Sequence, residues 1–294
     1  KLLLATGGRV IQFPFGGEDI IYFRTLEDYR RLRKLVDSVD KFAVIGGGFI
    51  GSEIAAVLNQ NGKEVVMFFP EAGIGALTFP GALSEHVTQY YRSKGVRVLA
   101  GEWVSDVRRK GGKLKVVTKS GHVETVDGVV AGIGIRPNVE LAVQAGLKVN
   151  KGIVVNRYLQ TTHRDIFAAG DVAEFYNPVL DRYMLVEHEE HANMTGYLAG
   201  QGMAGSLQPY EHLPYFYSEI FDLAYEAVGE ISADLETVMD WEEPFQKGVI
   251  YYLRGKQLRG VLMWNLRRKV NAARRLLQTV GEIHSPEALI GKIR

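Results

Sequence analysis

The sequence predicts an α/β fold, with a parallel sheet flanked by helices and a separate C-terminal α+β domain. Three observations predict it. Short apolar strands alternate with helical segments over roughly the first hundred residues. Three glycines, Gly46, Gly48 and Gly51, stand between one strand and the helix that follows it. From about Pro209 the composition becomes aromatic and typical of strands.

The N-terminal elements follow from apolar periodicity and from glycine stops. The helix over residues 18–38 rests on Tyr29, Leu32 and Val36, which recur at helical spacing. Gly62 is a natural end for the next helix. In chain order we expect a strand at 1–8, a polar helix at 18–38, a strand at 42–45, a helix at 52–61 and a strand at 64–69.

The pattern changes beyond the first strands and helices. Two alternating segments, 113–118 and 122–127, are joined by glycine turns and predict an antiparallel meander within 104–130. The remaining expected elements are a helix at 81–94, strands at 96–99 and 129–135, a strand and turn at 165–171, and a helix at 191–203.

Composition excludes several classes of function. Charged residues make up 23% of the 294 and the formal net charge is +1, so neither nucleic acid nor an anionic membrane is an expected partner. No apolar run has the roughly 18 residues of a membrane span. The chain has no cysteine, hence no disulfide, thiolate metal site or dithiol relay of its own. We expect a reducing compartment, cytoplasmic or organellar, and no metal site.

The glycine pattern Gly46-x-Gly48-x-x-Gly51 predicts a dinucleotide site. The first glycine permits a tight turn, the second lets the backbone approach a pyrophosphate, and the third lets the helix pack closely on the strand. The N-terminus of the helix then offers free N–H groups and a positive dipole to the phosphates. The alternative is a glycine turn with a purely structural role.

Glu71 is the expected partner of the adenosine ribose. It lies 20 positions after Gly51, which is the usual distance for the acidic residue of such sites. No Lys or Arg follows directly to meet a 2′-phosphate, so the sequence favours NADH over NADPH. The alternative is a solvated glutamate in a turn.

Five segments in a fixed order carry a resemblance to a known family. They are Leu3–Gly8, Phe69–Glu71, Thr162–Asp171, Val186–His188 and Tyr217–Gly229. Together they resemble the two-dinucleotide-fold flavoproteins, within them apoptosis-inducing factor and the ferredoxin and rubredoxin reductases. The resemblance implies a Rossmann-type NAD domain inserted in an FAD domain. We therefore expect an FAD-binding domain at 1–12 and 134–207, an NAD-binding domain at 13–133 and a C-terminal α+β domain at 208–294.

The resemblance also implies roles for individual residues. Phe49 would lie against the nicotinamide ring, Glu53 toward its amide, and His188 at the junction of flavin and nicotinamide. Asp171 would accept hydrogen bonds from the flavin ribityl chain. Further residues implied at the flavin are Thr6, Gly7, Gly134, Gly170, Glu187 and Tyr217.

Plainer interpretations of these residues stay open. Phe49 also suits an apolar turn, and a carboxylate such as Glu53 is favoured in the first turns of any helix. Asp171 could be a helix cap, and His188 a packing residue. A basic run, Arg267–Lys269 with Arg274 and Arg275, could dock an acidic electron carrier from a helix that follows Trp264, or it could be a solvated face.

The function implied is that of an FAD-dependent NADH oxidoreductase. Hydride would pass from NADH to FAD, and electrons to a ferredoxin-type carrier, a quinone or oxygen, since this chain holds no dithiol. One alternative is an NADH-responsive redox-sensing interaction protein with slow turnover, with a homodimer as one assembly. A third is a simple NAD-binding module.

The FAD site is expected to be incomplete. The family's FAD domain opens with its own glycine-rich strand–turn–helix, and no second unit set between a strand and a helix is predicted in this chain. We therefore expect this chain to bind FAD weakly or not at all.

Overall fold

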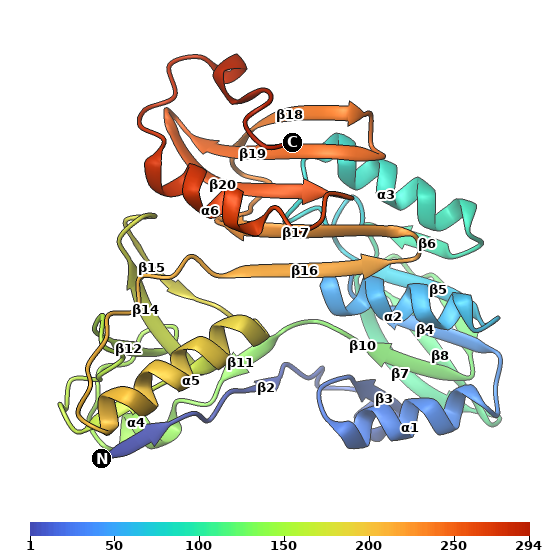
Figure 1. Ribbon diagram of the computed structural model, residues 1–294. Helices are drawn as coiled ribbons and strands as arrows, with labels where there is room; N and C mark the ends of the chain where they lie inside the picture. Colours follow the sequence, from blue (N-terminus) through green and yellow to red (C-terminus); the bar gives the residue numbers. More distant parts are fainter.

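The computed structural model describes residues 1–294 and contains three regions around a common centre (Figure 1). The first holds a five-stranded parallel sheet, the second two small sheets with a long helix, and the third a five-stranded antiparallel sheet. The helices are α1 (Leu26–Val36), α2 (Phe49–Gln60), α3 (Gly81–Ser93), α4 (Glu140–Gln144), α5 (Glu189–Met203) and α6 (Val270–Thr279), with short 3-10 turns η1 (Gly17–Asp19), η2 (Gly170–Val172) and η3 (Pro286–Leu289).

The parallel sheet has the order β3-β10-β4-β5-β6. Its strands are β3 (Ile20–Tyr22), β4 (Lys41–Ile45), β5 (Glu64–Phe69), β6 (Arg97–Ala100) and β10 (Gly128–Ala131). Four of these strands and the helices α2 and α3 lie where the periodicity predicts them. A parallel sheet covered on both faces needs apolar residues on both, which explains the continuous apolar runs of β4 and β5.

The helix expected over 18–38 is shorter than predicted. It begins at Leu26, because Thr25 caps it and exchanges a capping-box pair of hydrogen bonds with Asp28. The preceding residues Ile20–Tyr22 are fully buried and add the strand β3 to the sheet. Tyr29, expected on the apolar face of the helix, is 51% exposed, so that prediction was wrong; Leu32 is buried as expected.

The predicted meander covers one face of the parallel sheet. It consists of β7 (Val104–Lys110), β8 (Lys113–Thr118) and β9 (Val123–Val126), paired antiparallel. Alternate residues such as Leu114, Val116 and Val126 are buried against Val66 and Phe68 of the sheet. The other face of the sheet is thereby left to α2, α3 and the C-terminal region.

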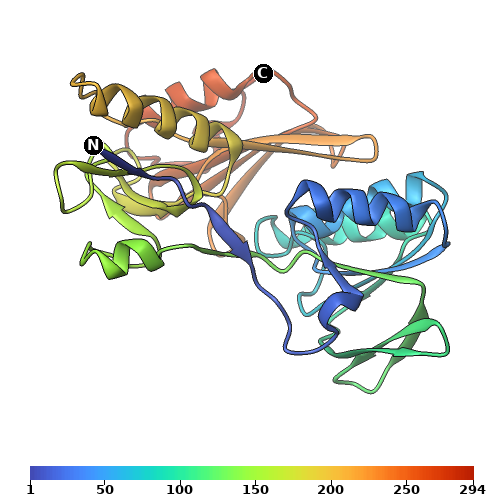
Figure 2. The ribbon, with the colours of Figure 1, turned by 90° about the horizontal axis from the view of Figure 1, so that it is seen from below.

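Two antiparallel strands link the first region to the second. They are β2 (Gly8–Val10) and β11 (Ile135–Pro137), and Figure 2 shows them crossing between two lobes. The second region pairs β1 (Leu2–Leu4) with β13 (Ile166–Ala168) and holds a sheet of β12 (Ile153–Val155), β14 (Ala173–Asn177) and β15 (Arg182–Leu185). The strand expected at 1–8 is thus two strands, and within β1 only Leu4 is buried.

Helix α5 contains a second set of glycines at the dinucleotide spacing. Gly200, Gly202 and Gly205 match the pattern, but they lie in the last turn of α5 and just after it. A helix C-terminus carries carbonyl groups and a negative dipole, which repel a phosphate. The glycine spacing at this end of α5 therefore does not indicate a dinucleotide site.

The C-terminal region is an antiparallel sheet of order β16-β17-β20-β19-β18. Its strands are β16 (Tyr215–Ile220), β17 (Leu223–Gly229), β18 (Glu236–Glu243), β19 (Lys247–Arg254) and β20 (Gln257–Trp264). One face packs on α6 and the chain's last residues, where Ala273 and Leu277 are buried. The other face packs on the first region, which confirms the predicted α+β character.

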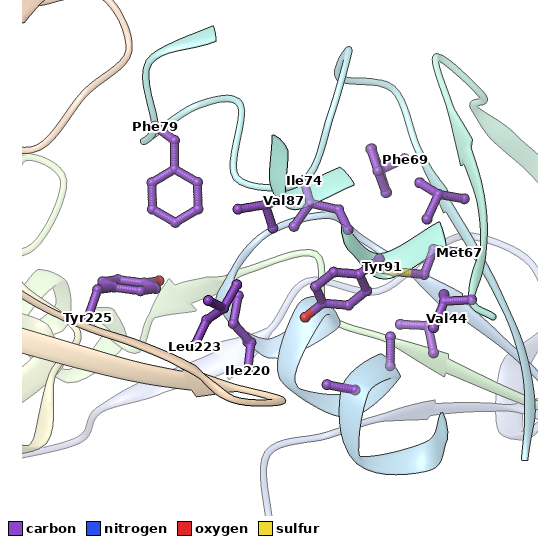
Figure 3. Packing of buried hydrophobic residues seen from close by; sticks show 14 of the residues in the cluster. Val44, Met67, Phe69, Ile74, Phe79, Val87, Tyr91, Ile220, Leu223 and Tyr225 are labelled. Atoms are coloured by element: carbon purple, nitrogen blue, oxygen red, sulfur yellow. The ribbon is translucent and has the colours of Figure 1, made fainter. Parts of the chain in front are cut away.

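A single hydrophobic core joins the C-terminal sheet to the first region. Figure 3 shows Ile220, Leu223 and Tyr225 rising from the β16–β17 hairpin toward Tyr91 and Ile74. All five side chains are at most 4% exposed. The strand β16 is therefore fixed against α2 and α3 by buried apolar surface. No helix of the structure combines the length and apolar character that a membrane crossing requires.

Candidate functional site

The three glycines of the turn after β4 have the different environments that their proposed roles require. Gly46 has φ +120°, and a Cβ there would lie 2.3 Å from the carbonyl oxygen of Gly132. A Cβ on Gly51 would lie 2.0 Å from the Gly46 oxygen. Around Gly48 a Cβ would meet nothing within 4 Å. Two glycines thus permit close packing, and the middle one borders open space that a phosphate can enter.

The N-terminus of α2 opens toward that space. Gly48 is its N-cap and no side chain caps the helix. The first N–H groups of α2 are then free for an anion, and the helix dipole favours one. Glu71 follows β5 at the neighbouring strand end; its backbone oxygen accepts from Gly101, and its partly exposed side chain takes part in no ion pair. This set of donors and one acceptor fits a nucleotide diphosphate and ribose.

Glu53 lies one turn into α2 and is half-buried. Its carboxylate accepts a hydrogen bond from the hydroxyl of Ser218 on β16. Burial raises the pKa of Glu53 above its ordinary value; the Ser218 hydrogen bond opposes that rise, and the charge of Glu219 adds to it. A carboxylate so placed can accept a hydrogen bond from an amide group.

Phe49 and His188 both contact the ring of Phe216. The ring of Phe216 stacks on His188 at a centroid distance of 4.6 Å and meets the edge of Phe49 at 5.2 Å. His188 is the N-cap of α5. Burial lowers the pKa of His188, against the opposing charges of Asp171 and Glu190. The imidazole therefore stays neutral near pH 7.

Glu53, His188 and Phe216 border an open groove of about 860 Å³ where the three regions meet, whereas Phe49 is not among its lining residues. Helix α2 supplies one wall, the start of α5 a second and strand β16 a third (Figure 1). The residues lining it are Ile50, Glu53, Glu187, His188, Glu189, Glu190, Asn193, Met194, Tyr197, Tyr215, Phe216 and Tyr217. The groove therefore brings together Glu53, Glu187, His188 and Tyr217 from the sequence predictions.

Asp171 and Glu187 lie side by side near the link between the first two regions. Asp171 is in η2 and pairs with Arg24, with 2.9 Å between Nη2 and Oδ2. Burial raises the pKa of Glu187, and the charge of Asp171 raises it further, while Arg24 lowers it. Gly170, with φ +73°, donates its N–H to Thr195 of α5 at 2.9 Å. Arg24 thus pairs with Asp171 and acts on Glu187 only through its charge.

The remaining predicted residues lie at turns and at the surface. Thr6 donates to the backbone oxygen of Asn138 at 2.6 Å, and Gly7 adopts φ +59° beside Arg24. Gly134, with φ +97°, accepts from the N–H of Ile11 at the base of the link. Tyr217 is 60% exposed and stacks on Tyr215 at 6.4 Å. Thr6, Gly7 and Gly134 do not line the groove.

A family model described as pyridine nucleotide-disulphide oxidoreductase matches residues 1–196. The chain belongs to the pyridine nucleotide-disulphide oxidoreductase family. Members of this family bind FAD and NAD(H). A second model, for the C-terminal domain of mitochondrion-associated apoptosis-inducing factor, matches residues 239–279.

Relatives of the family agree with this assignment. The chain is 35% identical to apoptosis-inducing factor 1, mitochondrial, of Dictyostelium discoideum, over 94% of this chain and 57% of that protein. It is 34% identical to a ferredoxin–NAD(+) reductase component of the anthranilate 1,2-dioxygenase system of Burkholderia cepacia, over 98% and 72%. The chain thus spans little more than half the length of the first of these relatives.

Solved structures show the same fold. A ferredoxin reductase for the CYP199A2 system of Rhodopseudomonas palustris is 28% identical and superposes with a TM-score of 0.89, covering 97% of this chain and 72% of that one. A covalent putidaredoxin reductase–putidaredoxin complex is 29% identical with a TM-score of 0.85, covering 94% and 69%.

The candidate site contains residues that the sequence did not single out. Arg24 faces Asp171, and Phe216 and Ser218 face Phe49, His188 and Glu53. No local pattern marks Arg24, because its partner is 147 positions away. For β16 a signal existed: apolar or small residues alternate with polar ones from Phe216 to Ile220, which predicts that this face is buried.

The predicted basic cluster is not one face. Arg267 and Arg268 precede α6, and Arg268 has φ +64°. Arg267 pairs with Glu219, whereas Arg274 is directed inward to Glu190 and the backbone oxygen of Leu213. Since Arg274 has neutralising partners and is largely buried, it is not free to dock an electron carrier.

Proposed function

We propose that this chain belongs to an FAD-dependent NADH oxidoreductase that passes electrons to a ferredoxin-type carrier, a quinone or oxygen. One observation carries the proposal. The open phosphate turn at Gly48 leads along α2 to a groove where Glu53 and His188 approach from two different regions. A dinucleotide lying along α2 would place its reactive end at that meeting point.

The residues would divide the work of binding and orientation. The backbone at Gly48 and the free N–H groups of α2 would hold the pyrophosphate, and Glu71 would accept from the ribose hydroxyls. Phe49 would lie against the nicotinamide ring and Glu53 would accept from its amide. The chemistry that the bound cofactors supply is hydride transfer between nicotinamide and flavin.

On the flavin side the residues would orient a neutral, hydrogen-bonding ligand. Asp171, 14% exposed and held by Arg24, would accept from ribityl hydroxyls, with Thr6, Gly7 and Gly170 shaping the turns around it. His188 would border the junction in its neutral form and exclude water from it together with Tyr217. We keep residues 1–12 and 134–207 as the FAD-binding domain, 13–133 as the NAD-binding domain and 208–294 as the C-terminal domain.

The acceptor is proposed from the relatives. The Burkholderia relative is a ferredoxin–NAD(+) reductase component, and one solved neighbour is a complex of a reductase with putidaredoxin. A small redox protein is therefore the favoured acceptor, with a quinone or oxygen as the others.

The proposal is tested by reduction of flavin. The protein is saturated with FAD and mixed with NADH in the absence of oxygen, and the bleaching of flavin absorbance is followed by stopped flow. Bleaching that saturates with NADH is expected. Gly48→Val is the matched variant: its fold should persist, because the space around Gly48 is open, but bleaching should be lost. Equal bleaching by both proteins would place the nucleotide elsewhere.

Nucleotide choice is tested at Glu71. The dissociation constants of NADH and NADPH are measured by titration on one preparation, and NADH should bind more tightly. Glu71→Ala should weaken NADH by about 1–2 kcal/mol, the size of a charge-assisted hydrogen bond. Glu64→Ala is the control, because Glu64 begins β5, the strand that Glu71 follows. Equal or tighter binding of NADPH by the wild type would contradict the assignment.

A second candidate is an NADH-responsive interaction protein with slow turnover. The match of residues 239–279 to the C-terminal domain of apoptosis-inducing factor favours it. Rapid turnover with a ferredoxin would support the reductase. Slow turnover together with an NADH-dependent change of oligomeric state, seen by light scattering, would support the sensor and a homodimer.

A further inference from the structure

Every second side chain of strand β16, in the C-terminal region, points toward the proposed nicotinamide end of the nucleotide site. Ser218 and Ile220 are both 2% exposed and Phe216 is half-buried, whereas Tyr217 and Glu219 point outward. This is the period of a strand with one packed face. In Figure 1 β16 is the edge strand of its sheet and lies directly above α2 and α5.

The packed face of β16 contacts all three residues expected around the nicotinamide. Phe216 contacts both Phe49 and His188, and the hydroxyl of Ser218 donates to the carboxylate of Glu53. Phe49 and Glu53 come from α2, and His188 from the start of α5. One strand of the third region thus touches side chains of the other two.

Ser218 is the only hydrogen-bond or ion-pair partner of the Glu53 side chain. A glutamate has three rotatable bonds, so its carboxylate takes many positions unless a partner selects one. Ser218 itself is fixed: it is buried, and its backbone pairs with Tyr225, which stacks on Trp264 at 5.7 Å. The rigid sheet therefore sets the position of a carboxylate on another region.

We propose that Ser218 is a positioning residue for NADH, holding the Glu53 carboxylate in one orientation toward the nicotinamide amide. The inference rests on the proposed function, in which Glu53 accepts from that amide. It adds that the C-terminal region determines how strongly the nicotinamide half of the nucleotide is bound. The adenosine half, at Gly48 and Glu71, has no contact with Ser218 in this scheme and should not respond to its substitution.

That difference defines the experiment. ADP-ribose carries the adenosine, pyrophosphate and both riboses but no nicotinamide, so it reports on the first half of the site alone. Calorimetry on the full chain measures the dissociation constants of NADH and ADP-ribose for the wild type, Ser218→Ala, Ser218→Thr and Glu53→Ala. Ser84→Ala is the control, since Ser84 is also buried and donates to a backbone oxygen, that of Ile74.

Ser218→Ala should weaken NADH roughly three- to tenfold, about the net effect of one ordinary hydrogen bond, and leave ADP-ribose unchanged. Ser218→Thr keeps the hydroxyl and should restore NADH binding. In the Glu53→Ala background, Ser218→Ala should have no further effect, because its partner is gone. Ser84→Ala should leave the ratio of the two constants as in the wild type.

Two outcomes would overturn the inference for different reasons. If Ser218→Ala weakens NADH and ADP-ribose alike, or neither, then the hydroxyl has only a structural role and the proposed function stands. If the wild type binds neither NADH nor ADP-ribose, the proposed function itself is wrong and the inference falls with it.

Discussion

The C-terminal region contacts its two neighbours through different physical forces. Toward the parallel sheet it contributes Ile220, Leu223 and Tyr225 to one continuous apolar core (Figure 3). Toward the second region it packs Leu180 into the core on its other face and adds partly buried ionic contacts. Glu190 of α5 accepts from Arg274 of α6 at 2.7 Å and bonds His212 at 2.6 Å. Here a carboxylate near the start of one helix is held by the side chains of the opposite region.

The difference bears on how the proposed site is assembled. Phe49 and Glu53 are brought to β16 by burial of apolar surface, which is strong but not directional. His188 is brought there by α5, whose first turn is held by the Glu190–Arg274 pair two residues further on. Directional ionic contacts fix the angle of a helix but depend on pH and salt. The two halves of the groove should therefore respond differently to mutation and to solvent.

The largest effect is expected in the apolar contact. Tyr225 is 4% exposed and stacks on Trp264 while meeting the edge of Phe79. Tyr225→Ala leaves a large cavity and should lower the free energy of unfolding by about 3–5 kcal/mol, measured by denaturant titration. Tyr29→Ala, at a residue 51% exposed, should cost little. Similar losses of unfolding free energy for Tyr225→Ala and Tyr29→Ala would show that the shared core does not stabilise the contact between the two regions.

The ionic contact should be weaker. Arg274 is 17% exposed and Glu190 25%. Arg274→Met keeps most of the volume and leaves the carboxylate with His212 and the backbone N–H of Tyr215, so a loss of about 1–3 kcal/mol is expected, below that of a fully buried pair. A loss equal to that of Tyr225→Ala would contradict the proposed difference between the contacts.

The contact between Glu190 and Arg274 should weaken in acid. Burial alone would raise the pKa of Glu190, but the hydrogen bonds from His212 and Arg274 outweigh it and hold the pKa below its ordinary value. Stability from this shift is present above the unfolded pKa, about 4.3, and is lost as the pH falls through the lower folded pKa. The difference in unfolding free energy between wild type and Arg274→Met should therefore shrink below about pH 4. A constant difference from pH 6 to 3 would refute the ionic origin.

Much of the fold follows from local patterns in the sequence. The strand–turn–helix at Gly46–Gly51 was predictable because each of its three glycines has a distinct steric requirement. The parallel strands were predictable because they are continuously apolar. The helix expected at 18–38 begins later than its apolar periodicity predicts, because the capping pair of Thr25 and Asp28 marks its start. That pair is itself a local signal, so the boundary can be predicted once capping is considered together with periodicity.

The assembly of the site could not be predicted in the same way. Ser218 and Glu53 are 165 positions apart, and nothing in the local sequence of either residue identifies the other. The arginines near the C-terminus make the same point. The sequence predicts one basic cluster that includes Arg267 and Arg274, yet the structure directs one outward and the other into a contact between regions. Which residues meet is decided by tertiary packing.

The smallest effect is expected at Arg267, which provides a matched comparison with Arg274. Arg267 pairs with Glu219 at 2.8 Å, but the two side chains are 69% and 61% exposed. Water screens such a pair, and two long side chains lose entropy to hold it, so Arg267→Met should change the free energy of unfolding by less than about 0.5 kcal/mol. Denaturant titrations of Arg267→Met and Arg274→Met in low and high salt make the test. The same chemical change at two neighbouring arginines should then differ severalfold, because only Arg274 joins two regions of the molecule. Equal effects would mean that exposure does not distinguish the two contacts, and the ionic contact at α5 would have to be assigned to His212 alone.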